Sequence, residues 1–122
     1  MKPGQKKILE SKLETVENAY PGRDYTIDIT LPEFTCLCPL SGYPDFAVIR
    51  VQYIPDRLIL ELKSVKLYIN KFRDKGIFHE EVVNKILDDL VAACRPRWME
   101  VTGDFNPRGN VKTIVRAEHK KE

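Results

Sequence analysis

Apolar and polar side chains alternate along four stretches of the chain, at the two-residue period of a β-strand with one buried face. In the clearest stretch, Ala47, Ile49, Val51 and Tyr53 share one face. The pattern therefore predicts strands at residues 24–31, 45–54, 97–105 and 110–119.

Prolines mark where two of these strands should end, because proline cannot donate to a strand ladder. Pro32 is expected to end the first strand. The turn after Pro55 predicts a hairpin between residues 45–54 and 57–63, and the NPRG turn at residues 106–109 joins the last two strands.

Between the two groups of strands the apolar spacing becomes helical. Residues 64–74 carry apolar side chains at this spacing, with Ser64 as a candidate N-cap and Gly76 as a stop signal. Residues 80–94 form the clearest helix, with an acidic first turn. The order hairpin, helix, helix, hairpin predicts an α+β fold, in which two consecutive helices cover one face of an antiparallel sheet of about four strands.

The first 22 residues precede these elements and form an N-terminal arm or helix. The helical spacing of apolar residues at 5–19 is mixed, so this part is predicted as an amphipathic helix or an extended arm. Residues 1–122 are predicted to be one domain, with no room for a separate cofactor-binding domain. The sheet would have long edge strands, which predicts edge pairing between subunits in a ring-like homo-oligomer.

The amino-acid composition limits the classes of protein to which the chain can belong. A hydrophobic content of 43% with 31% charged residues is typical of a soluble globular protein. No apolar run approaches the roughly 18 residues of a membrane span, and no secretory signal is recognisable, so we expect no membrane partner and a cytoplasmic location. The net charge of +2 is too small to indicate a direct nucleic-acid partner.

The three cysteines favour reduced thiols. Cys36 and Cys38 are too close in sequence for a comfortable disulfide, and the total is odd. A zinc site would need further ligands, but Cys94, His79 and His119 show no second paired spacing of the zinc type. No metal is therefore expected.

Cys38 lies in the sequence TCLCPLSGYPDFA, just before a turn and seven positions before Asp45. A thiol in such a loop could be exposed and activated as a nucleophile, with Asp45 handling protons. The structural alternative is that Cys38 fills a small apolar gap and Asp45 caps a turn.

Three other groups have both a structural and a functional interpretation. His79 and Glu80 could cap the long helix, or could point into a pocket and bind the edge of a planar heterocycle. Lys63 and Lys66 could hold a phosphate at a helix start, or lie on a solvated face. The turn around Arg108 offers a cation, but is equally an ordinary hairpin turn.

Four sequence motifs occur together, and both their residues and their order along the chain are similar to those of one family. They are CPLSGYPDFA, ELKSVKLY, FHEE and FNPRGN. They resemble the short, single-domain form of the QueF family, the NADPH-dependent 7-cyano-7-deazaguanine reductases of queuosine biosynthesis. The resemblance covers about Phe34 to Val111. ELKSVKLY is its most specific part, since it resembles the motif that separates these reductases from related tunnelling-fold enzymes such as GTP cyclohydrolase I.

The resemblance implies a fold and a set of roles. The implied fold is the tunnelling fold, in which sheets of neighbouring subunits join into a barrel and the sites form at subunit interfaces. Cys38 matches the nucleophile that forms a covalent thioimide with the nitrile carbon, and Asp45 matches the general acid. The residues that match the substrate pocket are Leu60, Glu61, Leu62, His79 and Glu80. Those that match the NADPH site are Lys63, Ser64, Lys66, Arg108 and Gly109. Leu62 stands where many relatives have Ser, which affects only one side-chain hydrogen bond.

The implied reaction reduces the nitrile to a primary amine and consumes two NADPH. Thiolate addition converts a poor hydride acceptor into a thioimide, and an enclosed site protects the later imine from water. One alternative is an amidine-forming relative that acts on the cyano base in tRNA without NADPH, against which ELKSVKLY argues. The other is a non-catalytic purine- or pterin-binding module in which Cys38 is inert.

Overall fold

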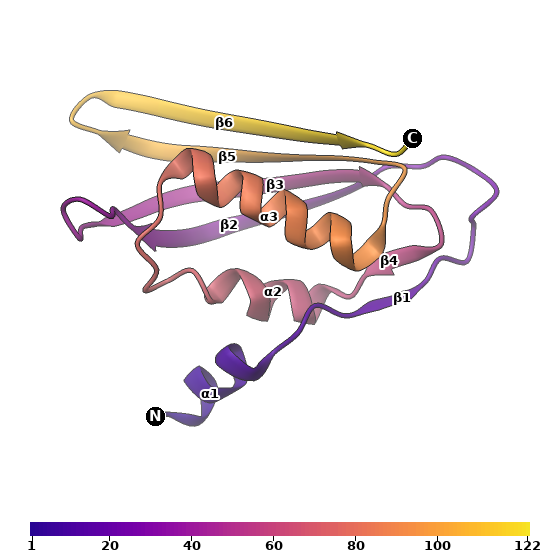
Figure 1. The fold of residues 1–122 in the computed structure, drawn as a ribbon, viewed down its shortest axis with the longest axis horizontal. Helices are drawn as coiled ribbons and strands as arrows, with labels where there is room; N and C mark the ends of the chain where they lie inside the picture. The colour runs from indigo at the N-terminus through magenta and orange to yellow at the C-terminus, as the bar shows by residue number, and fades with distance from the viewer.

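The computed structural model describes residues 1–122, and its main element is a four-stranded antiparallel sheet with two helices on one face (Figure 1). The strands follow the order β2-β3-β5-β6, and their bounds are Ile27–Leu37 (β2), Pro44–Ile54 (β3), Trp98–Arg108 (β5) and Val111–Lys120 (β6). The helices are α2, Leu62–Asn70, and α3, His79–Cys94. The predicted α+β class is confirmed, and so is the order hairpin, helix, helix, hairpin, although the first hairpin consists of β2 and β3.

Strand β2 is longer than the sequence predicts. It continues past Pro32 to Leu37, and the pairing with β3 shifts register between Leu31 and Phe34. A proline is tolerated at such a bulge, and on an edge strand its missing N–H interrupts no second ladder. The prediction that Pro32 ends the strand was therefore wrong, and the extra residues carry the chain to Cys38.

The predicted hairpin between residues 45–54 and 57–63 was also wrong. Both edges of β3 are already paired, one with β2 and the other with β5. The short strand β4, Leu58–Leu60, pairs instead with β1, Thr15–Glu17, in a separate two-stranded sheet.

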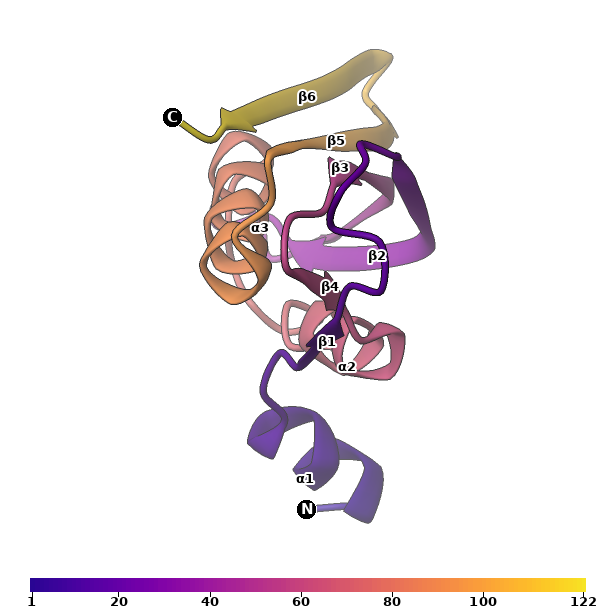
Figure 2. The same ribbon diagram turned by 90° about the vertical axis from the view of Figure 1, so that its right-hand side faces the viewer.

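The N-terminal arm contains both predicted conformations, a helix followed by an extended segment. Helix α1, Pro3–Glu10, buries no residue and projects away from the sheet (Figure 2). The extended part is held more firmly. The N–H of Glu14 donates to Ser64 Oγ at 2.9 Å, and the N–H of Glu61 donates to the Glu14 carbonyl at 2.9 Å. The arm therefore docks on β4 and on the start of α2.

The core lies between the inner face of the sheet and α3. From α3 it takes Val82, Val83, Ile86, Leu87 and Leu90, and from the sheet Ile49, Val51, Met99 and Val101. Burying each such side chain contributes about 1.5–3 kcal/mol. Tyr68 joins the two helices, because its hydroxyl donates to Asp89 Oδ2 at 2.6 Å.

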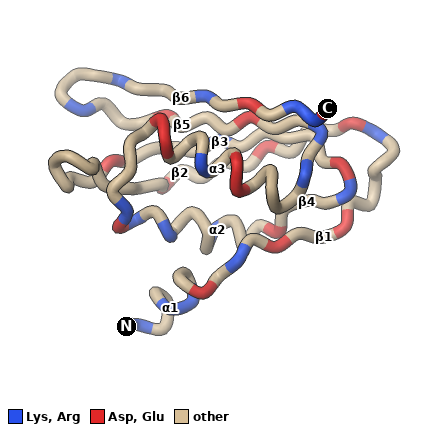
Figure 3. The backbone as a smooth tube through the Cα atoms, viewed as in Figure 1, with Lys and Arg blue, Asp and Glu red and all other residues tan.

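Charged residues are spread over all parts of the chain (Figure 3). Both signs occur on α1, α3, β3, β5 and β6, whereas the charged residues of β2 are all acidic and those of α2 are both lysines. None of the three helices is long and apolar enough to cross a membrane.

Candidate active site

One end of the four-stranded sheet gathers several of the predicted site residues, and we call it the thiol end. It contains the loop between β2 and β3, the start of β3, the start of α3 and the turn between β5 and β6 (Figure 1). The antiparallel pairing brings these segments together, because the end of β2, the start of β3 and the end of β5 lie at the same end of the sheet. Cys38, Asp45, His79 and Arg108 meet there.

A tight turn surrounds the sulfur of Cys38. The N–H of Cys38 donates to the Tyr43 carbonyl at 2.8 Å, and the N–H of Gly42 donates to the Cys38 carbonyl at 2.9 Å. Gly42 has φ +76°, a left-handed conformation that glycine adopts without strain. The turn directs the Ser41 hydroxyl and the backbone N–H groups of Ser41 and Leu40 at the thiol.

These donors favour the thiolate. The hydroxyl of Ser41, the N–H groups of Ser41 and Leu40, and the guanidinium of Arg108 together lower the pKa of Cys38 to about 6. Cys38 is only 6% exposed, because the turn folds around it, so the expectation of an exposed thiol was wrong. A thiolate that dominates at neutral pH is suited to nucleophilic attack.

The other two cysteines differ from Cys38. Burial raises the pKa of Cys36 to about 11 and that of Cys94 to about 12. Both are at most 1% exposed. Their thiols stay protonated at neutral pH, as expected for the packing role that the sequence indicates.

Asp45 is 7% exposed and lies between two partners. One carboxylate oxygen accepts a hydrogen bond from Arg108 Nη2, and the other lies 3.0 Å from His79 Nε2. The His79 ring is not aligned for a hydrogen bond with Asp45, so its Nε2 has no hydrogen-bond partner. The ring stacks on Phe105, with 3.7 Å between ring centroids and 6° between planes. The contacts fix a carboxylate, an imidazole and a guanidinium next to the thiol.

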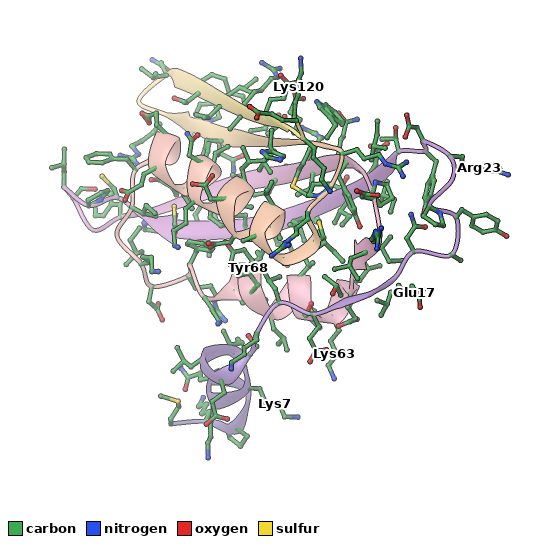
Figure 4. The ribbon with its side chains drawn as sticks, turned by 45° about the vertical axis from the view of Figure 1, so that its right-hand side comes forward. Lys7, Glu17, Arg23, Lys63, Tyr68 and Lys120 are labelled. Atoms are coloured by element: carbon green, nitrogen blue, oxygen red, sulfur yellow. The ribbon has the colours of Figure 1, made fainter.

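Most of the remaining predicted residues lie at or just before the start of α2, which we call the cap end. Glu61 is the N-cap of α2: its side chain accepts from Lys63 N–H and from Ser64 N–H, both at 2.8 Å. Ser64 was predicted as the N-cap, but it lies one turn further on, 4% exposed, and its hydroxyl donates to the Glu61 carbonyl. Ser64 is thus part of the helix start, whereas Lys63 and Lys66 are exposed. Figure 4 shows the Lys63 side chain pointing away from the protein.

The two ends lie far apart within one chain. Leu60, just before the cap end, donates its N–H to Tyr53 Oη at 3.0 Å, and Tyr53 lies at the opposite end of β3 from Asp45. At roughly 3.4 Å per residue, these two positions on β3 are separated by about 27 Å. Within a single chain, the predicted substrate-binding residues are therefore divided between the two ends, and so are the predicted cofactor-binding residues.

Two further predicted residues, Glu80 and Gly109, lie at the thiol end. Glu80 is exposed, and its carboxylate forms no hydrogen bond or ion pair. Gly109 and Asn110 have φ +56° and +69°, as in a type I′ hairpin turn. Gly109 thereby fixes the position of Arg108 at the end of β5.

Ser41 and Phe105 also lie at the thiol end, but the sequence did not predict a functional role for either. The Pro-Leu-Ser-Gly turn was a usable signal for Ser41, because a serine in a tight turn often directs its hydroxyl at a neighbouring group. No local signal indicated Phe105. Its stacking on His79 depends on how β5 and α3 pack together.

An activated thiol beside a buried carboxylate, on an antiparallel sheet covered by helices, is the arrangement expected of an enzyme that acts by covalent catalysis. Residues 44–122 match the model of a protein family described as QueF-like protein. The chain belongs to this QueF-like family.

Relatives and a solved structure agree with this assignment. The chain is 59% identical over its full length to the NADPH-dependent 7-cyano-7-deazaguanine reductase of Thermosynechococcus vestitus, covering 92% of that protein. It is also 59% identical to the reductase of the same name from Microcystis aeruginosa, covering 93%. The crystal structure of the archaeosine synthase QueF-Like in the apo form matches with a TM-score of 0.74 and 26% identity, over 80% of this chain and 95% of that one. The predicted family and its tunnelling fold are confirmed.

Proposed function

We propose that this protein is an NADPH-dependent reductase that converts the nitrile of 7-cyano-7-deazaguanine into a primary amine. The observation that carries the proposal is the low-pKa thiol of Cys38 beside Asp45, in a chain that is 59% identical over its whole length to reductases of that name. A nitrile carbon is an electrophile, and a thiolate next to a proton-carrying group is suited to attack it.

In the proposed mechanism, the Cys38 thiolate attacks the nitrile carbon and a C–S bond forms. The nitrile nitrogen gains a proton, for which Asp45 is the nearest carboxyl group, and His79 lies close enough to Asp45 to exchange protons with it. Bound NADPH supplies hydride, and reduction to the amine consumes two. Between the two reductions the C–S bond breaks and the thiolate leaves, which its low pKa favours.

The exposed lysines of the cap end fit the phosphates of NADPH. Lys63 and Lys66 lie at the start of α2, and neither forms an ion pair within the chain. Free ammonium groups near a helix N-terminus are suited to bind an anion. Ser64 would not contact the phosphates but would hold the first turn of α2 in place, because its N–H and its hydroxyl both donate to Glu61.

The separation between the thiol end and the cap end supports a site built from two subunits. Strands β2 and β6 are the edges of the sheet and are free to pair with another copy. Large apolar side chains are also exposed around the thiol end, namely Leu40, Tyr43, Phe46 and Phe78. Covering them in a homo-oligomer would enclose the substrate and exclude water from the imine.

A second candidate function is amidine formation without NADPH. One solved structure that the chain resembles is that of an archaeosine synthase, at 26% identity. Such an enzyme would need the same thiol but not the lysines of the cap end. The 59% identity to the reductases favours reduction.

The test is to mix the purified protein with 7-cyano-7-deazaguanine and NADPH, and to follow nicotinamide oxidation. Mass spectrometry with the nitrile alone then detects the covalent adduct on Cys38. Oxidation of two NADPH per nitrile, together with the adduct, is the expected result. An adduct without oxidation would instead favour the amidine-forming function, and neither signal would favour a non-catalytic binding module.

A further inference from the structure

The imidazole ring of His79 lies between a carboxylate and an aromatic ring. Its Nε2 lies 3.0 Å from Asp45 Oδ2, and its face stacks on Phe105, with 3.7 Å between ring centroids and 6° between planes. The His79 side chain is 16% exposed, whereas Phe105 is completely buried. Because Nε2 has no hydrogen-bond partner in the chain, packing rather than hydrogen bonding sets the plane of the imidazole.

The Phe105 ring is itself held by its neighbours. Phe105 is the last residue of β5 that pairs with both β3 and β6 before the register shift, and its ring packs edge-on against Phe34, with 6.4 Å between centroids. A Cβ at position 103 would lie 2.8 Å from Phe105 Cε2 and 2.6 Å from Val83 Cγ2, closer than two side-chain carbons approach. Gly103 therefore admits both the ring and the helix that carries His79. A side chain packed this tightly keeps one orientation.

We propose that Phe105 is a positioning residue: its ring fixes the plane of the His79 imidazole and so keeps Nε2 next to the Asp45 carboxyl group. This proposal rests on the proposed function, in which His79 and Asp45 exchange protons. Proton transfer requires hydrogen-bond reach, and a misplacement of about 1 Å can slow a reaction by roughly 10²-fold. Stacking restrains the tilt of the imidazole but contacts neither nitrogen at its edge, so both nitrogens remain able to carry a proton.

Phe72 provides a matched control, because it is a phenylalanine of the same core without a contact to His79. It is 1% exposed, and its ring packs against Phe34 and Tyr68. Neither of these neighbours belongs to the site. Phe105→Leu and Phe72→Leu both remove a buried ring and keep an apolar side chain, but only the first removes the surface on which the imidazole stacks.

The experiment measures NADPH oxidation by Phe105→Leu, His79→Ala and the double variant. We expect Phe105→Leu to lower kcat about tenfold at an unchanged KM for the nitrile, because a misplaced acid–base group loses part of its roughly 10²–10⁴-fold contribution. In the His79→Ala background the same substitution should have almost no effect on kcat, because no imidazole remains to be positioned. Phe72→Leu should keep the wild-type kcat.

An equal loss of kcat from Phe105→Leu in the wild-type and His79→Ala backgrounds would overturn the proposal, since Phe105 would then act through general packing. A raised KM without a change in kcat would overturn it as well. The pH profile of Cys38 alkylation by iodoacetamide, measured without nitrile, should be the same in Phe105→Leu and the wild type. A shifted profile would mean that the whole thiol end has changed, and would contradict an effect confined to His79.

A measurement on the wild-type protein alone keeps the inference testable if the leucine variant folds poorly. The chain contains two histidines, so comparison with His119→Gln assigns the ring proton resonances of His79. The ring current of Phe105 should shift these resonances upfield, and resonances at ordinary positions would show that the imidazole is not held on Phe105. Because this spectrum needs neither nitrile nor NADPH, it tests the inference even where a lack of NADPH oxidation refutes the proposed function.

Discussion

The thiol end and the cap end use the same kinds of side chain for opposite purposes. At the cap end, the Ser64 hydroxyl bonds to backbone groups of Glu14 and Glu61, and so helps to hold the fold. At the thiol end, the Ser41 hydroxyl accepts from the Tyr43 N–H at 3.2 Å within an exposed turn, and it also favours the Cys38 thiolate. The presence of a serine in a candidate motif is thus not evidence of function by itself. The groups that its hydroxyl contacts show whether the serine supports the fold or the site.

The acidic residues of the two ends differ in the same way. The Glu61 carboxylate accepts from two backbone N–H groups, so moving it to bind a ligand would uncap α2. The Asp45 carboxylate is paired only with side chains, Arg108 and His79. Side chains can move and exchange protons without unfolding a helix, so Asp45 is the better placed of the two for chemistry.

The strongest test of the contrast is to remove the thiol. Cys38→Ala should abolish the covalent adduct with the nitrile and all turnover, because no other thiol in the chain has a lowered pKa. Mass spectrometry and NADPH oxidation measure both losses. Cys36→Ala is the matched control and should keep the adduct. Turnover that survives in Cys38→Ala would refute the thioimide mechanism.

Substitution of Glu80 tests whether the thiol end also binds the deazaguanine base. Its exposed carboxylate has no partner in the chain, so it is free to accept N–H groups of the deazaguanine. Glu80→Ala should weaken substrate binding by roughly 1.5–3 kcal/mol, the range for a hydrogen bond to a charged group. Isothermal titration with the nitrile measures the change.

The neighbouring exposed Glu81 supplies the control for this measurement, because Glu81→Ala removes the same charge from the same helical turn. We expect its affinity to equal that of the wild type. Equal affinities of all three proteins would mean that the base binds elsewhere.

Two serine variants, one at each end, test the contrast between the cap end and the thiol end. Ser64→Ala should lower the free energy of unfolding by about 1–3 kcal/mol, because the N–H of Glu14 loses its acceptor. Ser41→Ala should raise the pKa of Cys38 and lower stability by less than Ser64→Ala does, because the Tyr43 N–H that loses its acceptor lies in an exposed turn and can bond to water instead.

Urea unfolding and the pH profile of alkylation measure these two effects separately. A Ser41→Ala variant that loses as much stability as Ser64→Ala, with no change in the alkylation profile, would contradict the contrast between the two ends.

Periodicity predicted most of the fold, because its main elements are amphipathic. Helix α3 and strands β3, β5 and β6 each place one apolar face on the common core, which local spacing reveals. The end of β2 and the pairing of β4 were mispredicted for a different reason. Whether a strand passes Pro32, and which strand β4 joins, depends on neighbours that are distant in sequence.

The site was predictable only in part. Cys38 and Asp45 could be identified from the turn between them and from the family motifs, since both lie on one local segment. The pairing of Arg108 with Asp45 depends on β5 ending beside the start of β3, which the spacing of residues does not show. The motifs likewise could not reveal that Glu61 caps α2 near the opposite end of β3 from Asp45.

A further expected effect is a pH dependence of stability due to the thiol end. The folded-state pKa of Cys38 is about 6, below its ordinary value of 9.0, so between these two pH values the unfolded chain binds more protons than the folded one. The contribution of Cys38 to stability should therefore be absent below pH 6, rise from pH 6 to 9 and stay constant above. The difference in urea midpoint between wild type and Cys38→Ala measures it. Cys36→Ala should differ from the wild type by an amount independent of pH in this window, because the pKa of Cys36 is raised and its contribution changes only above pH 9. If the difference in urea midpoint between wild type and Cys38→Ala is also independent of pH in this window, the thiolate is not favoured in the folded protein.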